Sequence, residues 1–378
     1  MSNSQNSVSA ETSRRITSLR FLLAVFVVFI HNNFTAKSVA EIFQDTGVQT
    51  AFCQNAFGKW IQLFISGGIT RSAVPLFFLF AAYLQFKKGD SYGTLLRKKA
   101  RSLVLPFFLW PVLNIALFVG MKLAVARIVP GLLAQPDVIP QFSWTAADWL
   151  HAFFGYEDME NGRTFGGYLG QMWFVRDLFI LIVLSPLLRC VARSFPVCTV
   201  VAVSFFYFCD VRPLIVAEQA LFYYMLGFFW AEYDVPLFEI AERIKWRALI
   251  PLYLALWLAT WLVFGEYSQC YWFMVLAACL IMLKCAALIE RNERAFAAAE
   301  YLAPMSFWLF AVHNPLLNGF LVKLWLHFFP MTTPARCLAE YFCVNILTVV
   351  LGTASGLLLR KICPPLFSVL NGGRKFCV

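Results

Sequence analysis

Polar segments divide this sequence into about ten apolar runs, most of them long enough to cross a membrane as helices. A spanning α-helix needs about 20 predominantly apolar residues. Hydrophobic residues make up 60% of the chain and charged residues only 14%, whereas soluble domains carry about 25% charged residues. We therefore predict an all-α polytopic membrane protein with helices near residues 16–34, 63–86, 103–126, 171–190, 196–210, 217–232, 247–264, 271–290, 305–328 and 337–359.

Lys and Arg are distributed unevenly between the predicted loops. Most lie in the loops on the side that also holds both chain ends. Cytoplasmic loops are enriched in these residues, so both termini are predicted to be cytoplasmic. The net charge of +10 thus reflects topology and not nucleic-acid binding. Residues 1–13 are predicted to be disordered, residues 14–360 to form one membrane domain, and residues 361–378 to form a cytoplasmic tail.

Several cations fall inside the predicted spans. Those near span ends are predicted to extend their side chains to the interface; they are Lys122, Lys284 and Lys323. Arg71 follows Gly67 and Gly68, where the helix is predicted to break or begin. Arg176 lies deeper in its span. Ionisable groups at such depth cost several kcal/mol on insertion scales and usually mark a working site.

Arg20 and His31 are the ionisable residues of the first apolar helix, and no other charge separates them. Eleven helical residues turn through about 1100°, within about 20° of three full turns, and rise about 16 Å. The two side chains therefore share one face at two depths. One interpretation is a functional pair in a polar interior. The other is an Arg reaching one interface and a His in the opposite headgroup layer.

Four segments taken together indicate a family. They are the Arg20–His31 pair, the apolar stretch 74–83 with the basic loop 96–101, the segment 172–178 and the segment 306–316. In this order and spacing they resemble the acyltransferase-3 family of integral-membrane acyltransferases, which O-acetylate bacterial surface polysaccharides. The resemblance extends from about Arg15 to Arg360. One departure is that the family's usual Ser-Gly is Ala81-Ala82 here.

The resemblance implies transfer of an acetyl or other short acyl group from cytoplasmic acyl-coenzyme A to a hydroxyl of a cell-surface glycan or its lipid-linked precursor. The enzyme would be a multi-pass protein of the inner membrane, surrounded by lipid, with no metal and no permanently bound cofactor. Such transfer requires a base for the hydroxyl proton and stabilisation of a tetrahedral oxyanion. We assign His31 as the base or as an acyl-carrying nucleophile, and Arg20 as its catalytic partner and a donor contact.

Further residues are assigned to the donor. Arg97, Lys99 and Arg101 suit the phosphates of coenzyme A. The competing explanation is that they only set the membrane topology, but the family resemblance favours at least one phosphate contact. Trp173 and Arg176 are three residues apart and share a helical face. The alternative for Arg176 is an ion pair with Asp177 or Glu218 that stabilises buried structure.

The acceptor is assigned to Asn32, His313, Trp144 and Trp149. The two tryptophans lie in a long predicted external loop, and such aromatic side chains are typical both of sugar-binding surfaces and of membrane-interface belts. A rival function is a glycan exporter or flippase, which would also use intramembrane charges. Transporters often carry internal repeats, and none is visible in this sequence.

Overall fold

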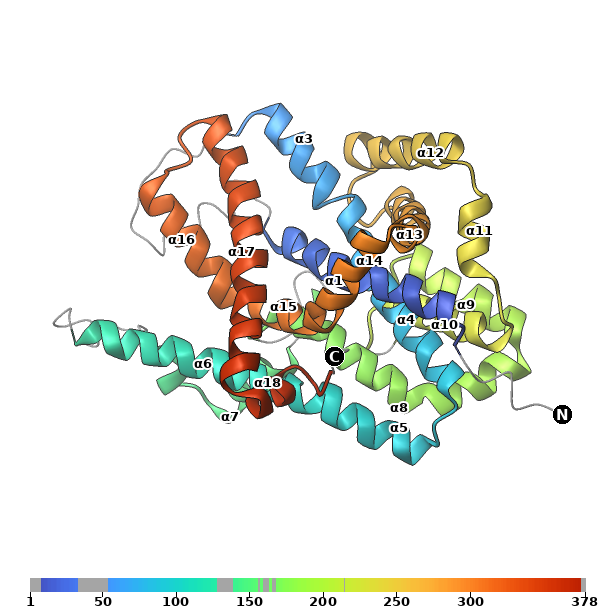
Figure 1. Ribbon diagram of the computed structural model, residues 1–378, viewed down its shortest axis with the longest axis horizontal. Helices are drawn as coiled ribbons and strands as arrows, with labels where there is room; N and C mark the ends of the chain where they lie inside the picture. The colour runs from blue at the N-terminus through green and yellow to red at the C-terminus, as the bar shows by residue number, and fades with distance from the viewer. Residues whose placement is uncertain are drawn as a thin grey trace.

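The structure is a computed structural model that describes residues 8–32, 54–127, 139–155, 157–158, 163–164, 168–213 and 215–374. Helices dominate the described residues (Figure 1). Up to residue 172 the elements are α1 (Ala10–His31), α3 (Ala56–Ile65), η1 (Ile69–Ser72), α4 (Ala73–Lys88), α5 (Tyr92–Lys99), η2 (Ala100–Val104), α6 (Leu105–Ala126), η4 (Pro140–Phe142), α7 (Ala146–Phe154), β1 (Glu157–Asp158), β2 (Arg163–Thr164) and η5 (Gly170–Met172).

In the second half of the chain, the described residues form helices joined by short turns. Its elements are α8 (Trp173–Ser194), α9 (Pro196–Phe208), α10 (Glu218–Glu232), α11 (Leu237–Arg243), α12 (Trp246–Ala259), η6 (Thr260–Phe264), α13 (Gln269–Arg291), α14 (Glu293–Leu302), η7 (Ala303–Met305), α15 (Ser306–Val312), η8 (His313–Leu317), α16 (Asn318–Phe328), α17 (Pro334–Ile362) and α18 (Pro364–Leu370). The predicted all-α class is confirmed, apart from the two-residue ladder of β1 with β2.

The helix bounds agree with the apolar runs, but the number of spans does not reach ten. Within the described residues, six continuous helical stretches are long and apolar enough to cross a membrane, and seven if a pair bent by 120° between α8 and α9 counts as one. α10 has only 15 residues, and α1 carries three arginines. The protein is therefore a multi-pass membrane protein, while ten spans stays a prediction.

α1 begins at Ala10, within the segment that was predicted to be disordered. The Ser9 side chain accepts a hydrogen bond from the backbone N–H of Thr12 (3.1 Å), which satisfies an N–H that has no partner within the helix. Residues 10–13 are therefore helical, and the prediction of disorder is wrong for them. Residues 1–7 lie outside the described part of the chain.

Helix ends that were predicted to share one side of the membrane meet in the structure. At the start of α1, Arg15 pairs with Glu242 (2.7 Å) at the end of α11 and with Glu290 (3.2 Å) at the end of α13. Lys87 at the end of α4 pairs with Asp234 just after α10. The polar ends of these five helices, α1, α4, α10, α11 and α13, thus lie on one face. Which side of the membrane this face occupies stays a prediction.

α4 and α10 form the tightest helix pair of the interior. A Cβ at Gly227 of α10 would lie 2.3 Å from the carbonyl oxygen of Leu79 and 2.8 Å from the Cβ of Ala82. Small residues allow two helix backbones to approach this closely. Ala82, at the departure from the family's Ser-Gly, therefore preserves close packing.

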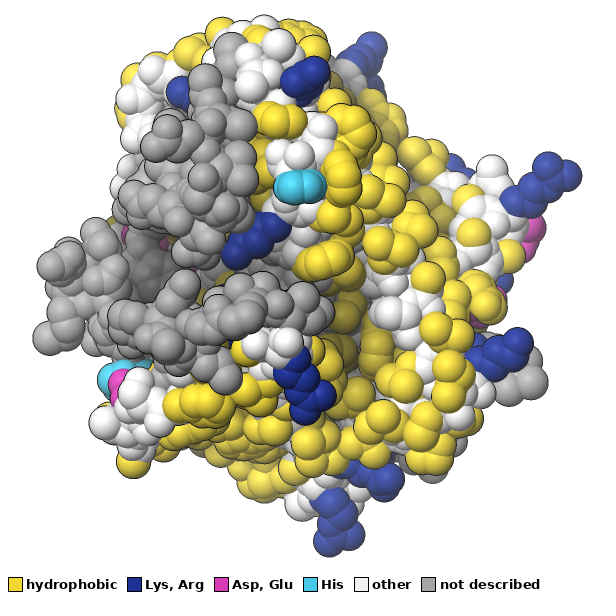
Figure 2. All heavy atoms as spheres, turned by 90° about the vertical axis from the view of Figure 1, so that its left-hand side faces the viewer, with side chains coloured by type: hydrophobic (Ala, Val, Ile, Leu, Met, Phe, Trp, Pro, Cys, Tyr) yellow, Lys and Arg dark blue, Asp and Glu magenta, His cyan; other side chains and the backbone are white. Residues whose placement is uncertain are grey.

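Hydrophobic side chains also cover much of the outside. Figure 2 shows them over the face formed by α16, α17 and α6, with basic side chains mostly toward its margins. Exposed examples are Leu117, Phe320, Val350 and Leu358, each more than half exposed. An apolar surface of this size is typical of contact with lipid.

Candidate active site

α1 lies across the middle of the molecule and carries both residues of the principal pair (Figure 1). It packs against α4, α13, α14 and α15. His31 is its last residue, and Asn32 follows as the C-cap. Because both residues lie on one continuous helix, the depth of about 16 Å between Arg20 and His31 is fixed by helix geometry.

His31 faces a second histidine from the other end of the chain. The rings of His31 and His313 lie 5.1 Å apart between centroids, tilted by 49°. His31 is exposed, whereas His313 is fully buried. The Nδ1 of His313 lies 2.8 Å from the carbonyl oxygen of Phe310, to which it donates a proton, leaving Nε2 with a free lone pair. Among the described residues Nε2 has no hydrogen-bond partner.

The position of His313 depends on a break in its helix. The π-helical turn η8 contains Asn314 in an extended conformation (φ −134°, ψ 147°), followed by Pro315. The side-chain nitrogen of Gln171 donates to the freed carbonyl oxygen of Asn314 (2.6 Å). Pro315 also lacks the N–H that would bond the carbonyl oxygen of Ala311, and the same Gln171 nitrogen lies 3.4 Å from that oxygen. Gln171 was not assigned from the sequence, although it directly precedes the Met172–Leu178 segment.

A buried polar group from α17 lies beside Asn32. The side-chain nitrogen of Asn345 donates to the backbone oxygen of Tyr341 (2.7 Å) and approaches that of Asn32 (3.4 Å). Glu340 is fully buried next to Asn32, yet neither of its carboxylate oxygens has a well-formed hydrogen bond among the described residues. Glu340 was not assigned to the site from the sequence. Its position inside the last apolar run was the available signal.

Arg71 is held in place by its own partners. Its Nη2 lies 3.0 Å from Glu266, and its Nε donates to the backbone oxygen of Ser66 (2.9 Å). The predicted helix break is confirmed here, because α3 ends at Ile65 and η1 begins at Ile69. The charge of Arg71 is therefore balanced.

Arg176 has structural partners as well. Its Nε pairs with Asp177 (2.9 Å) and its Nη1 donates to the backbone oxygen of Phe154 (2.8 Å). The fully buried Asp177 also accepts a hydrogen bond from the backbone N–H of Ala217 (2.8 Å). The interpretation of Arg176 as a stabilising ion pair thus describes its geometry. Trp173 packs near Phe78 (6.1 Å between ring centroids).

Arg20 has no acidic partner among the described residues, and two further cations lie near it. Lys99 is close enough to Arg374 and Arg20 to be repelled by both. Burial, together with the charge of Arg20, lowers the pKa of Arg374 to about 9. All three side chains are partly exposed. Of the three, only Lys99 is near enough to a carboxylate, that of Asp90, to be attracted by it, and such a group of partly exposed cations is suited to bind an anion.

The C-terminal turn places Arg374 at this position. The Asn371 side chain donates to the backbone oxygen of Pro304 (3.0 Å), and the indole nitrogen of Trp110 donates to that of Leu370 (3.0 Å). The Arg374 guanidinium then lies over the Phe307 ring at 4.0 Å. Nothing in the sequence indicated Arg374, because only tertiary contacts bring the tail to this place.

The predicted basic loop is a helix. Arg97 and Lys99 lie in α5, and Arg101 lies in η2, which continues into α6. Arg97 and Arg101 are exposed, while Lys99 is half-buried. Leu, Lys and Arg are good helix formers, and the basic residues occupy the last turn of α5, where they interact favourably with the helix dipole.

Trp144 and Trp149 form a separate aromatic group around α7. Their rings lie 4.9 Å apart, and Trp144 also approaches Tyr168 (6.2 Å). α7 folds back along α6, where Phe153 contacts Phe108 (5.5 Å between ring centroids). No contact of either tryptophan with His31 or His313 occurs within the described parts of the chain.

Comparison with known proteins identifies the family. Residues 14–360 match the family model described as an acyltransferase domain, the acyltransferase-3 family. This chain belongs to that family. It is therefore an acyltransferase, and the predicted resemblance is confirmed. The chain is also 25% identical over 389 residues to the succinoglycan biosynthesis protein ExoH of Rhizobium meliloti (strain 1021), covering 97% of this chain and 94% of that protein. No solved structure matches it.

Proposed function

We propose that this acyltransferase moves an acetyl or other short acyl group from cytoplasmic acyl-coenzyme A to a hydroxyl of a cell-surface glycan or its lipid-linked precursor. Family membership supports the group transfer. The name of the Rhizobium relative refers to succinoglycan biosynthesis, which supports a glycan acceptor. The enzyme would act in the inner (plasma) membrane, where it can meet a cytoplasmic donor.

The observation that carries the proposal is the arrangement of α1. It presents an exposed imidazole at one end and, about 16 Å away on the same face, an arginine that has no acidic partner in the described part of the chain. A long donor with phosphates at one end and a thioester at the other fits such a separation. The exposed His31 can reach a substrate hydroxyl.

In the proposed reaction His31 acts as the general base. It takes the proton of the acceptor hydroxyl while the oxygen attacks the thioester carbonyl carbon. The tetrahedral intermediate then collapses, the carbon–sulfur bond breaks, and the imidazolium returns its proton to the leaving sulfur. A covalent acyl-His31 route remains the mechanistic alternative. A burst of coenzyme A release in the absence of acceptor would distinguish it.

The donor phosphates are assigned to Arg20, Lys99 and Arg374. By binding the phosphate end, Arg20 also orients the donor so that its thioester lies near His31. Arg97 and Arg101 are exposed and contribute a weaker, screened attraction. Trp173 and Arg176 keep their assignment to the donor, with Arg176 acting through its ion pair to position the start of α8.

The acceptor is assigned to the opposite end of α1. Asn32 and His313 lie next to His31 and offer polar atoms without partners among the described residues. Trp144 and Trp149 are proposed as an outer surface on which sugar rings stack. Glu340 lies behind Asn32 and is proposed to position it.

The test is acyl transfer by the purified protein. Wild-type enzyme in lipid nanodiscs is incubated with acetyl-coenzyme A and glycan from cells that lack the protein, and free coenzyme A and glycan acetyl groups are measured. We expect both to rise together. Binding of glycan without consumption of acetyl-coenzyme A would instead favour the exporter or flippase.

A further inference from the structure

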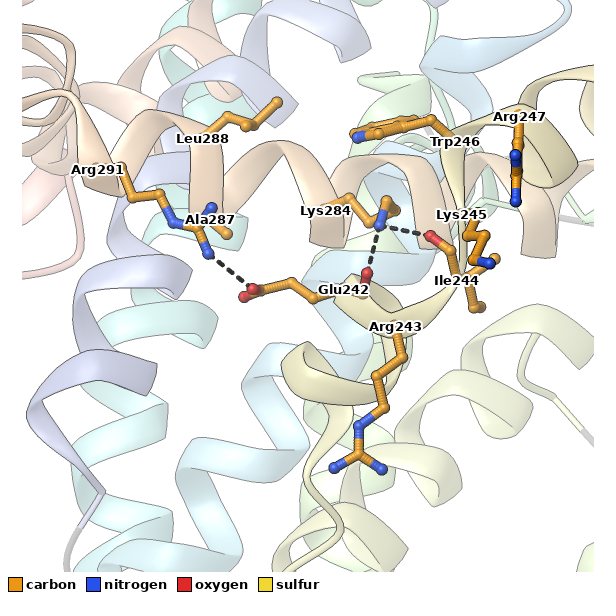
Figure 3. A pocket seen from close by; sticks show the side chains of 10 residues that line it. All are labelled: Glu242, Arg243, Ile244, Lys245, Trp246, Arg247, Lys284, Ala287, Leu288 and Arg291. Carbon is orange, nitrogen blue, oxygen red and sulfur yellow. Dashed lines mark hydrogen bonds and ion pairs between the residues drawn. The ribbon is translucent and has the colours of Figure 1, made fainter.

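A cavity of about 490 Å³ opens where the segment joining α11 to α12 packs on α13 (Figure 3). It lies at the polar face that holds the start of α1, on elements that carry neither Arg20 nor His31. The residues that line it are Glu242, Arg243, Ile244, Lys245, Trp246, Arg247, Lys284, Ala287, Leu288 and Arg291. Nothing in the proposed acyl transfer uses them.

Lys284 lines this cavity, and its side chain does not lie where it was predicted. Its ammonium donates to the backbone oxygens of Ala241 (3.0 Å), Glu242 (2.9 Å) and Ile244 (2.7 Å). Its side chain is buried and does not extend to the interface as predicted. Three carbonyl bonds fix the segment between α11 and α12 against α13, so the cavity is a built feature of the fold.

The cavity has a large excess of positive charge. Five of its lining residues are cations and one, Glu242, is a carboxylate. Glu242 is already engaged by Arg15 (2.7 Å) and Arg291 (2.9 Å). Within the described chain, Lys245 and Arg247 have no acidic partner. Figure 3 shows them at the same end of the cavity as Trp246, whereas Arg243 points away from Lys284.

The surroundings of the cavity are apolar. Trp246 is 37% exposed and Leu288 is 53% exposed. Beyond Trp246, α12 presents further exposed aliphatic side chains, including Ile250, Leu252 and Leu254. A free phosphate ion would make no favourable contact with this apolar surface. A molecule with an anionic head and hydrocarbon chains would contact both the cations of the cavity and the apolar surface beside it.

We propose that this cavity binds the phosphate headgroup of an anionic membrane lipid. Lys245 and Arg247 contact the phosphate, and the acyl chains lie along the exposed faces of α12 and α13. Basic pockets between transmembrane helices at the cytoplasmic surface have the chemistry that anionic lipids require. The Trp246 indole lies at the boundary between head and chains, where tryptophan is preferred. The bound lipid would clamp the α11–α12 segment to α13.

The experiment compares lipid binding by native mass spectrometry and thermal unfolding of the detergent-solubilised full-length protein. Phosphatidylglycerol is the probe, and phosphatidylcholine with the same acyl chains is the control lipid. We expect phosphatidylglycerol to bind more tightly and to raise the unfolding temperature. In the double variant Lys245→Gln/Arg247→Gln its affinity should fall about thirtyfold, since two basic contacts are removed.

A matched variant separates this site from general surface charge. Arg294→Gln/Lys361→Gln removes two exposed cations that do not line the cavity, and it should keep the wild-type affinity. Equal binding of both lipids, or unchanged affinity in the double variant, would overturn the proposal. So would coenzyme A binding that is lost in Lys245→Gln/Arg247→Gln, because the cavity would then be a nucleotide site.

Discussion

At the scale of single residues, the two histidines of the site differ in accessibility and in partners. His31 is exposed, and no hydrogen bond to it is formed by the described residues. His313 is fully buried and bonded to the carbonyl oxygen of Phe310. Removal of the first should therefore affect chemistry, and removal of the second should affect folding.

His31→Ala is expected to lower acyl transfer by about 10²- to 10⁴-fold, the usual contribution of a general base. Its unfolding temperature should stay close to that of wild type. His313→Ala should instead reduce the free energy of unfolding by about 1–3 kcal/mol, because it removes a buried hydrogen bond and leaves a void. Transfer assays and thermal unfolding check both. Normal glycan acetylation by well-folded His31→Ala would exclude His31 as the base.

Arg374 allows a test of the donor end that includes pH. Its pKa is lowered to about 9 by burial and by the charge of Arg20, so its charged form is disfavoured in the folded protein. The unfolded chain keeps this proton to higher pH, and stability should therefore rise as pH increases through about 9. Arg374→Gln should lose this rise and be more stable than wild type at neutral pH.

The same variant should gain less stability from coenzyme A, because one phosphate contact is missing. Lys361→Gln, which removes an exposed cation of α17, is the control and should behave like wild type. Thermal unfolding with and without coenzyme A, at about pH 7 and about pH 9.5, measures both effects. Equal stabilisation of wild type and Arg374→Gln by coenzyme A would remove Arg374 from the donor site.

At the scale of helices, the α4–α10 contact sets how closely the interior can pack. A Cβ at Gly227 would lie 2.3 Å from the Leu79 carbonyl oxygen, whereas a Cβ at Gly93 of α5 meets nothing within 4 Å. Gly227→Ala is therefore expected to force α4 and α10 apart and destabilise the protein by about 1–3 kcal/mol. Gly93→Ala should stabilise it by about 0.5–1 kcal/mol, because alanine favours a helix more than glycine does. Thermal unfolding of both variants measures these changes. A Gly227→Ala variant as stable as wild type would show that α4 and α10 can move apart without loss of stability.

At the scale of the whole molecule, the ion pairs of Arg15 with Glu242 and Glu290 gather the start of α1 with the ends of α11 and α13. The positive-inside rule predicts that this face is cytoplasmic. Cysteine introduced at Thr94 should then label only from the cytoplasm, and cysteine at Thr332, in the turn between α16 and α17, only from outside. Accessibility to a membrane-impermeant thiol reagent in intact and opened cells provides the measurement, in a background without other reactive cysteines. Labelling of both positions from one side would contradict the predicted topology.

Much of the helical layout could be predicted from the sequence, because apolar runs report local burial. The predicted span 271–290 corresponds to α13 (Gln269–Arg291), and the predicted span 217–232 corresponds to α10 (Glu218–Glu232). The basic segment 96–101 was wrongly predicted to be a loop, since its charge concealed residues of high helix propensity. The 120° bend between α8 and α9 could not be predicted, as the angle between two helices depends on what they pack against.

The sequence by itself determined the relation of Arg20 to His31, because both lie on one helix whose pitch fixes their separation and common face. Only the tertiary structure decided which residues lie next to this pair. It placed His313 against His31, Glu340 beside Asn32, and Arg374 near Arg20. These neighbours are up to several hundred residues distant along the chain. Their proximity results from helix packing and from the C-terminal turn, which local periodicity does not encode.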